Sequence, residues 1–186
     1  MRSIETEKDI NFLDKNLYTC YYYYVIKIDI DNKVIYNSIL KSKSMGELKD
    51  SIRNGKGNLI GFIGEYCVSS ILKDSVISNT YDYDLIHNNE TYDIKSKQTS
   101  VIPSMDYECS VADYNTRQKC DYYIFTRVLW KKENIRPDCV YVMGYYQKDR
   151  YFKDARFLKK GDIDGSNGFV VRADCWNLKY SELKSF

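Results

Sequence analysis

The sequence predicts a mixed α/β protein with a mixed central β-sheet flanked by helices. Three observations lead to this prediction. Residues 57–73 have the apolar periodicity of a helix, residues 81–99 have the pattern of a β-hairpin, and residues 121–129 and 139–146 are nearly continuous apolar runs. Such runs are typical of strands buried on both faces. A helix, a hairpin and buried strands in this order favour one sheet with helices packed against it.

Length and charge limit the classes of protein to consider. The chain has 186 residues, with 28 basic and 26 acidic side chains and a formal net charge of +2. A charge this small excludes a global field that draws the protein to polyanions, so any contact with DNA must be local. The length favours a single domain over 1–186. Within it we expect a core at about 57–146, an N-terminal hairpin and helix in 1–56, and a C-terminal extension over 147–186.

An N-terminal β-hairpin is expected before the core. Residues Tyr21 to Ile30 are rich in β-formers, a polar Asp-Asn-Lys turn follows, and Val34 to Leu40 resumes as a second β-like run. Glu47 follows Ser44 by three residues, which is a capping-box pattern and predicts that a short helix begins there. The glycines at 55 and 57 predict a break before the next helix.

The helix predicted over residues 57–73 carries an acid on its inward face. Gly61, Gly64, Glu65 and Val68 fall on one stripe of this helix. A glutamate among glycines and aliphatic residues is costly to bury unless it is paired or coordinated, and the glycines permit close approach to a strand. The alternative is that Glu65 lies at the edge of the stripe and reaches solvent.

The hairpin predicted over residues 81–99 gathers charged side chains. A polar turn at Asn88-Asn89 separates its two runs, and strand alternation places Asp93, Lys95 and Lys97 on one face of the second run. Asp82 and Asp84 of the first run share a face, so one of these carboxylates can come close to Asp93 and Lys95. Carboxylate oxygens bind Mg²⁺, and a neighbouring lysine can orient an attacking water. The alternative is an exposed hairpin with ordinary strand-edge charges.

An inward helix acid, an acidic strand, a turn and Asp-x-Lys on the next strand resemble, in this order, the PD-(D/E)XK nuclease superfamily. The resemblance covers about 57–146 and implies a restriction endonuclease-like core, hydrolysis of DNA phosphodiester bonds, and Mg²⁺ or Mn²⁺ as the cofactor. It assigns catalytic roles to Glu65, Asp84, Asp93, Lys95 and Gln98, and metal binding to the three acids.

One of two aspartates is the better match to the first metal-binding position of this superfamily, and the sequence differs from the motif at two points. Asp84 is preferred to Asp82 because it directly precedes the apolar pair Leu85-Ile86. No proline precedes either metal-binding aspartate, and the (D/E) position is the shorter Asp93. Gln98, three residues after the lysine, resembles the glutamine that some members place there.

A basic segment follows the predicted core. Residues 147–160 contain several lysines and arginines interleaved with aromatic side chains, and such a segment can neutralise phosphates. The nucleic-acid contacts that we expect are Lys97, Arg117, Lys148, Arg150, Lys153 and Arg156. A solvated amphipathic helix explains residues 147–160 equally well.

Other patterns bear on location and partners. The chain has no apolar run near ~18 residues and no basic-then-apolar start, so we expect no membrane contact. Its six cysteines form no Cys-x-x-Cys pair and it has one histidine, which excludes a typical structural zinc site. We therefore expect a cytoplasmic protein with reduced thiols, in the host cytoplasm if it is encoded by a phage.

The hypotheses that remain open differ in class. The first is a metal-dependent deoxyribonuclease of phage or mobile-element origin, with DNA as its partner; cutting of two strands by a single-site enzyme would favour a homodimer. The second is a non-catalytic nucleic-acid-binding or assembly protein on the same fold. The third is an interaction protein whose sheet is a docking surface.

Overall fold

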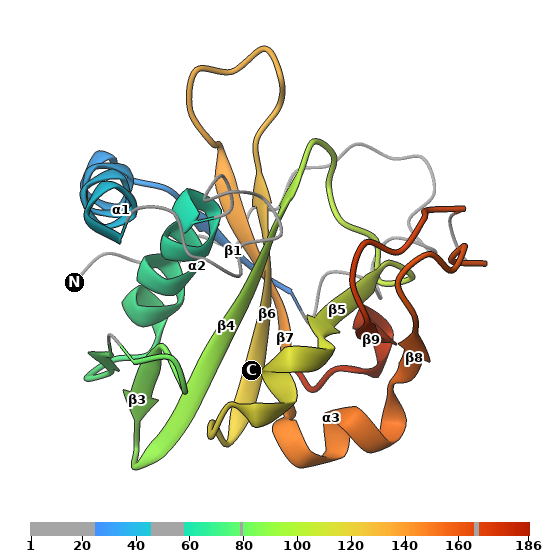
Figure 1. Cartoon of the computed structure of the whole chain (residues 1–186). Coiled ribbons are helices and arrows are strands. Elements are labelled where there is room, and N and C mark those ends of the chain that lie inside the picture. The colour runs from blue at the N-terminus through green and yellow to red at the C-terminus, as the bar shows by residue number, and fades with distance from the viewer. Residues whose placement is uncertain (1–24, 46–57, 79, 166–167) are drawn as a thin grey trace, which may run out of the picture.

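The computed structural model describes residues 25–45, 58–78, 80–165 and 168–186. Its elements in chain order are β1 (Ile26–Asp29), α1 (Asn32–Met45), α2 (Asn58–Ile71), β2 (Val76–Ile77), β3 (Leu85–His87), β4 (Glu90–Thr99), β5 (Glu108–Ala112), the 3₁₀ helix η2 (Asp113–Arg117), β6 (Tyr122–Leu129), β7 (Cys139–Gln147), α3 (Lys148–Asp154), β8 (Arg156–Leu158), β9 (Cys175–Lys179) and the 3₁₀ helix η3 (Tyr180–Glu182). These elements form a mixed α/β arrangement, so the predicted mixed α/β class is confirmed (Figure 1). Within the described residues, no helix is both long and apolar enough to cross a lipid bilayer.

A six-stranded sheet forms the centre of the structure. Its strand order is β1-β7-β6-β4-β3-β2. The central strands β4 and β6 are parallel, whereas β6 with β7 and β3 with β4 are antiparallel, so the sheet is mixed. The two apolar runs predicted as buried strands are β6 and β7, and this prediction is confirmed. The parallel pairing places each residue of β4 from Tyr92 onward directly beside a residue of β6.

The helices α1 and α2 cover one face of this sheet (Figure 1). The helix predicted over residues 57–73 is α2, and its side chains Ile63 and Val68 are fully buried. Ile63 packs with Val128 and Val140 of the sheet. On this face the even-numbered residues of β4, such as Ile94, point toward the helix. The odd-numbered residues of β4 therefore point to the opposite face.

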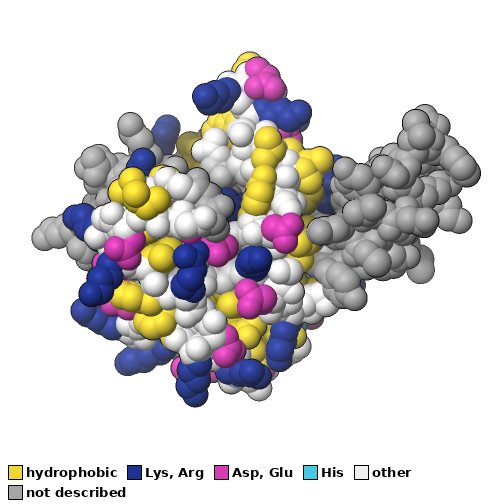
Figure 2. Space-filling view, turned by 90° about the vertical axis from the view of Figure 1, so that its right-hand side faces the viewer, with side chains coloured by type: hydrophobic (Ala, Val, Ile, Leu, Met, Phe, Trp, Pro, Cys, Tyr) yellow, Lys and Arg dark blue, Asp and Glu magenta, His cyan; other side chains and the backbone are white. Residues whose placement is uncertain are grey.

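A second sheet and α3 cover the opposite face, on the right-hand side of Figure 1. The second sheet has the strand order β5-β9-β8 and was not predicted from the sequence. The hydrophobic core between the two sheets contains large aromatic side chains. Among them are Tyr123, Phe125, Tyr151 and Tyr180, all at most 1% exposed. On the surface of this side, acidic and basic side chains are interspersed with hydrophobic and other side chains (Figure 2).

The prediction of an N-terminal β-hairpin is wrong for the residues that the structure describes. The first strand, β1, pairs with β7 at the sheet edge, and residues 34–40 lie in α1 rather than in a second strand. Asp31 caps this helix, since its Oδ1 accepts a hydrogen bond from the backbone N–H of Val34 at 2.7 Å. Of the apolar residues that favoured a strand, Val34 and Ile35 pack against the core that includes α2, whereas Tyr36 and Leu40 are exposed. Ser44 lies inside α1 and does not begin a new helix, and the rest of that predicted helix lies outside the described residues.

The central hairpin is confirmed. β3 and β4 are antiparallel, and Leu85 lies opposite Tyr92. Asn88 and Asn89 have φ values of 51° and 63°, the left-handed conformation that a two-residue hairpin turn requires. Asparagine tolerates this conformation better than most residues, so the local sequence and the turn agree.

Candidate active site

The helix that carries Glu65, α2, lies very close to two strands of the sheet. A Cβ atom at Gly64 would be 1.9 Å from Ser96 Oγ and 2.9 Å from Thr126 Oγ1, so only glycine permits this approach. The neighbouring Glu65 is 6% exposed. Its Oε2 accepts a hydrogen bond from Lys41 Nζ of α1 at 2.9 Å. The buried glutamate is therefore paired, as burial of a charge requires.

Asp84 directly precedes β3, and the neighbouring strand β4 extends past the position of Asp84. Its backbone N–H donates to the carbonyl of Tyr92, and its Oδ2 accepts from the backbone N–H of Ile94 at 2.7 Å. The Asp84 carboxylate thus accepts the hydrogen bond of Ile94 in place of a backbone carbonyl of the neighbouring strand. This contact fixes Asp84 beside the middle of β4.

Asp93 and Lys95 of β4 form a closed network with Gln118. Lys95 Nζ lies 2.5 Å from Asp93 Oδ2 and donates to Gln118 Oε1 at 3.0 Å. The amide of Gln118 donates to Asp93 Oδ1 at 2.7 Å and to the backbone carbonyl of Tyr81 at 3.0 Å. Asp93 and Gln118 are buried, at 4% and 5% exposed. The network holds the Asp-x-Lys pair in one geometry.

The three carboxyl groups act on one another. Burial raises the pKa of Asp84 well above its usual range, and the charges of Asp93 and Glu65 raise it further, against the opposing hydrogen bond from Ile94. Burial also raises the pKa of Glu65, an effect that Lys41 opposes and Asp93 reinforces. Glu65, Asp84 and Asp93 therefore form one electrostatic cluster, which we call the acidic cluster. A cation beside it would relieve both the repulsion and the burial cost.

The donor chemistry of the acidic cluster fits a hard divalent cation. Mg²⁺ and Mn²⁺ prefer carboxylate oxygens, and the cluster offers them from α2, from the start of β3 and from β4. In the described residues, however, no group of three or more His, Cys, Asp or Glu side chains has the geometry of an assembled metal site. Lys41 and Lys95 instead supply the positive charge.

Gln98 does not join the cluster. It lies on the face of β4 that points toward α2, is exposed, and donates weakly to the carbonyl of Trp130 at 3.5 Å. Lys97 lies on the same face of β4 as Asp93 and Lys95. Its Nζ donates to Ser110 Oγ of β5 at 2.9 Å.

The other basic residues expected to contact nucleic acid lie on separate elements. Arg117 is exposed at the end of η2, and Lys148, Arg150 and Lys153 lie on α3. Arg156 lies on β8 and is held by Glu108 and Asp164, at 3.1 and 2.9 Å. The structure therefore places the Arg156 guanidinium in a carboxylate network.

Sequence reasoning missed two residues that contact the predicted acids, Lys41 and Gln118. Lys41 directly follows the run Val34 to Leu40 that was predicted as a strand, and only the helical form of α1 directs it to Glu65. Gln118 lies in a connector without regular periodicity. Its position in a polar connector that leads into a buried strand was the only available signal.

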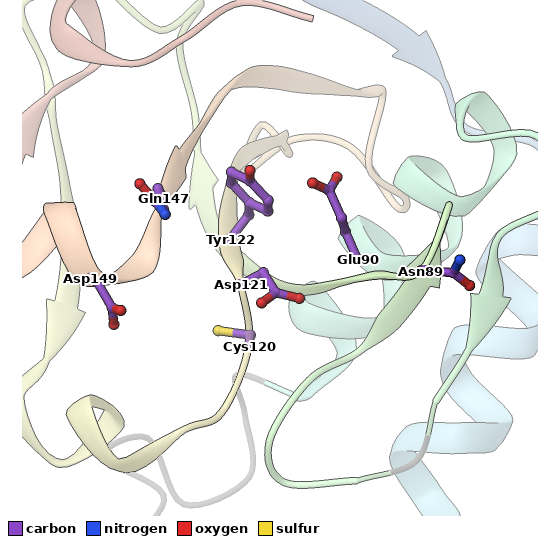
Figure 3. A pocket seen from close by; sticks show the side chains of 7 residues that line it. All are labelled: Asn89, Glu90, Cys120, Asp121, Tyr122, Gln147 and Asp149. Carbon is purple, nitrogen blue, oxygen red and sulfur yellow. The ribbon is translucent and has the colours of Figure 1, made fainter.

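A pocket of about 230 Å³ lies at the turn end of the hairpin (Figure 3). Three carboxylates line it, from Glu90, Asp121 and Asp149, together with Cys120. Asp121 Oδ2 accepts hydrogen bonds from the backbone and hydroxyl of Thr91, so this acid has a structural role. An acidic lining repels phosphate groups, so we do not place a nucleic acid here.

Comparison with known proteins adds no further assignment. No protein-family model matches this chain, and no curated protein matches it. The proposed function therefore rests on the acidic cluster and its lysines.

Proposed function

We propose that this protein is a metal-dependent deoxyribonuclease that hydrolyses phosphodiester bonds with a PD-(D/E)XK-type site on a restriction endonuclease-like core. The observation that supports this proposal most directly is that the buried carboxyl of Asp84 feels the negative charges of both Glu65 and Asp93, while Lys95 is paired to Asp93. A buried group of like charges is costly to keep for stability alone. Such a group is useful where a cation and a phosphate must be held together.

Each side chain has a distinct task in this proposal. Asp84 and Asp93 would hold Mg²⁺ or Mn²⁺, with Glu65 as a further ligand. The cation would polarise the phosphoryl group and stabilise the charge on the leaving oxygen. Lys95 would orient the attacking water or offset negative charge on the phosphate, and Gln118 would keep Lys95 in place. The order of α2, the β3–β4 hairpin and the parallel strand β6 supports the proposed core.

A cleavage assay tests the proposal. Supercoiled, linear, branched and single-stranded DNA, and RNA, are incubated with the purified protein and Mg²⁺ or Mn²⁺. We expect DNA cleavage that stops with EDTA, and a rate lower by at least about 100-fold in D93N and K95M. The control is D29N, because the side chain of Asp29 is 88% exposed on β1, away from the cluster. Uncut substrates under all conditions, or normal cutting by D93N, would contradict the proposal.

The second hypothesis predicts a different outcome of the same experiment. A non-catalytic binding protein would bind DNA in a salt-sensitive manner and leave it uncut. The ion pairs of Lys41 and Lys95 already neutralise part of the acidic cluster without a metal, which is the observation that favours this alternative.

A further inference from the structure

Two cations lie directly beside each other next to the candidate active site. Lys97 of β4 and Arg127 of β6 are register partners in the parallel pair, and both point to the face that carries Asp93 and Lys95. Like charges at directly opposed positions of a sheet destabilise it. The pair therefore needs a compensating interaction.

The partners of Lys97 and Arg127 in the structure are neutral. Lys97 Nζ donates to the Ser110 hydroxyl at 2.9 Å, and Arg127 donates to the Tyr180 hydroxyl and to the backbone carbonyl of Glu108. Among the described residues, no carboxylate lies within ion-pair distance of either cation.

Three other cations of the described chain differ in this respect. Lys41 is paired with Glu65, Lys95 with Asp93, and Arg156 with Glu108 and Asp164. The side chain of Glu108 acts on Lys97 only at longer range, because its oxygens accept from Arg156 and Asn177. The positive charges of Lys97 and Arg127 are therefore available to bind an anion.

The electrostatics agree with this geometry. Although Lys97 keeps solvent exposure along its side chain, the protein packed around it and the charge of Arg127 lower its pKa to about 8. A nearby anion would favour the charged form of the amine. Exposure gives a ligand access to Lys97, and the contacts to Ser110 and Tyr180 hold the two cations in position.

We propose that Lys97 and Arg127 form a binding subsite for a phosphodiester group of a nucleic-acid strand whose neighbouring phosphate lies at the acidic cluster. Lys97 follows Lys95 by two strand residues on the same face, a rise of about 6.6 Å. The subsite thus continues the row of Asp93, Lys95 and Lys97 away from the reacting centre. This inference rests on the proposed nuclease function for the identity of its ligand.

Binding of fluorescein-labelled duplex and single-stranded DNA, followed by anisotropy in EDTA over a series of salt concentrations, tests the subsite without cleavage. In K97Q we expect affinity at low salt to fall at least about tenfold, the loss of one charge-assisted contact. The slope of log K against log salt should decrease by about 0.7–0.9. K97R should restore most of both quantities, and K132Q, at an exposed lysine of the β6–β7 loop, should leave both unchanged.

The outcomes separate this inference from the proposed function. DNA cleavage together with K97Q binding equal to that of K132Q overturns the subsite alone. Salt-dependent binding that K97Q weakens, without cleavage under any condition, overturns the nuclease proposal and supports the subsite. Absence of DNA binding in both the wild type and D84N, which has one repelling charge fewer, overturns both. Because R127Q removes contacts to Tyr180 and Glu108 that hold the fold, the test relies on Lys97.

Discussion

Lys41 on α1 and Glu65 on α2 form an ion pair with 2.9 Å between Nζ and Oε2, and only 17% and 8% of their side chains are exposed. The ammonium also lies over the ring of Phe62, 4.5 Å from its centroid. Helix α1 therefore supplies the counterion of a predicted metal ligand. In the metal-free protein this pair offsets the burial of Glu65.

K41M should destabilise the metal-free protein by about 3 kcal/mol at pH 8, because it leaves a buried charge unpaired. The loss of Lys41 raises the pKa of Glu65 further. A raised carboxyl pKa gives stability at acid pH that is lost as pH rises, so the penalty should shrink toward pH 5. Urea unfolding at both pH values measures it. K43M, at an exposed lysine of the same helix, is the control, and an equal penalty for K41M at both pH values would contradict the prediction.

D84N should stabilise the metal-free protein. Asp84 has a raised pKa, so folding is favoured with its proton bound and stability is lost as pH rises from the ordinary aspartate range through the raised value. Asparagine carries no charge and can still accept the hydrogen bond from Ile94. In EDTA at pH 8 we expect a Tm increase of about 2–4 °C, the shift that ~1 kcal/mol produces in a chain of this size. The increase should vanish near pH 4, and a D84N variant less stable than D82N at pH 8 would argue against the acidic cluster.

Affinity for Mn²⁺ should increase with pH. Protons compete with the cation for carboxylates whose pKa is raised, and both Asp84 and Glu65 are such groups. Calorimetric titrations from pH 5.5 to 8 should show tighter binding at each step, with proton release at the acid end. D84N should bind weakly at every pH. Binding that is independent of pH in the wild type would place the cation elsewhere.

Gln118 and Gln98 form a matched pair for the role of a glutamine near Lys95. Q118A removes hydrogen bonds to Asp93, Lys95 and the Tyr81 carbonyl, and should cost about 1–3 kcal/mol of unfolding free energy and reduce cleavage. Q98A should change the unfolding free energy by no more than about 0.5 kcal/mol, because Gln98 is exposed on the other face. Denaturant unfolding and cleavage rates measure the two effects. Equal effects of the two variants would show that the hydrogen-bond network of Gln118 contributes neither to stability nor to cleavage.

Gly64 and Gly61 test the close approach of α2 to the sheet. In G64A the new Cβ would meet Ser96 and Thr126, so we expect a loss of about 1–3 kcal/mol through overpacking. In G61A nothing lies within 4 Å of the new atom, and the helix should gain about 0.5–1 kcal/mol. Denaturant unfolding of both variants measures the difference. A stable G64A would mean that α2 is not held against β4 at this position.

Much of the candidate site was predictable because its determinants are local. Strand alternation places Asp93, Lys95 and Lys97 on one face, and the Asn88-Asn89 turn determines the hairpin that brings Asp84 to β4. The periodicity of α2 predicts that Glu65 faces inward. The same alternation explains Gln98: β4 continues to Thr99, so a residue three positions after Lys95 must point to the opposite face.

The remaining features depend on partners that are distant in the sequence. Val34 to Leu40 has a composition that suits a strand, and packing against α2 together with the Asp31 cap selects the helix instead. The second sheet joins β5 to β9 across a long separation, which no local pattern records. The sequence by itself determined the mixed α/β class, the central hairpin and the faces of β4, because turns and periodicity act over neighbouring residues. Only the tertiary structure decided that Lys41 and Gln118 contact the acids and that Lys97 lies beside Arg127, because those contacts depend on how whole elements pack.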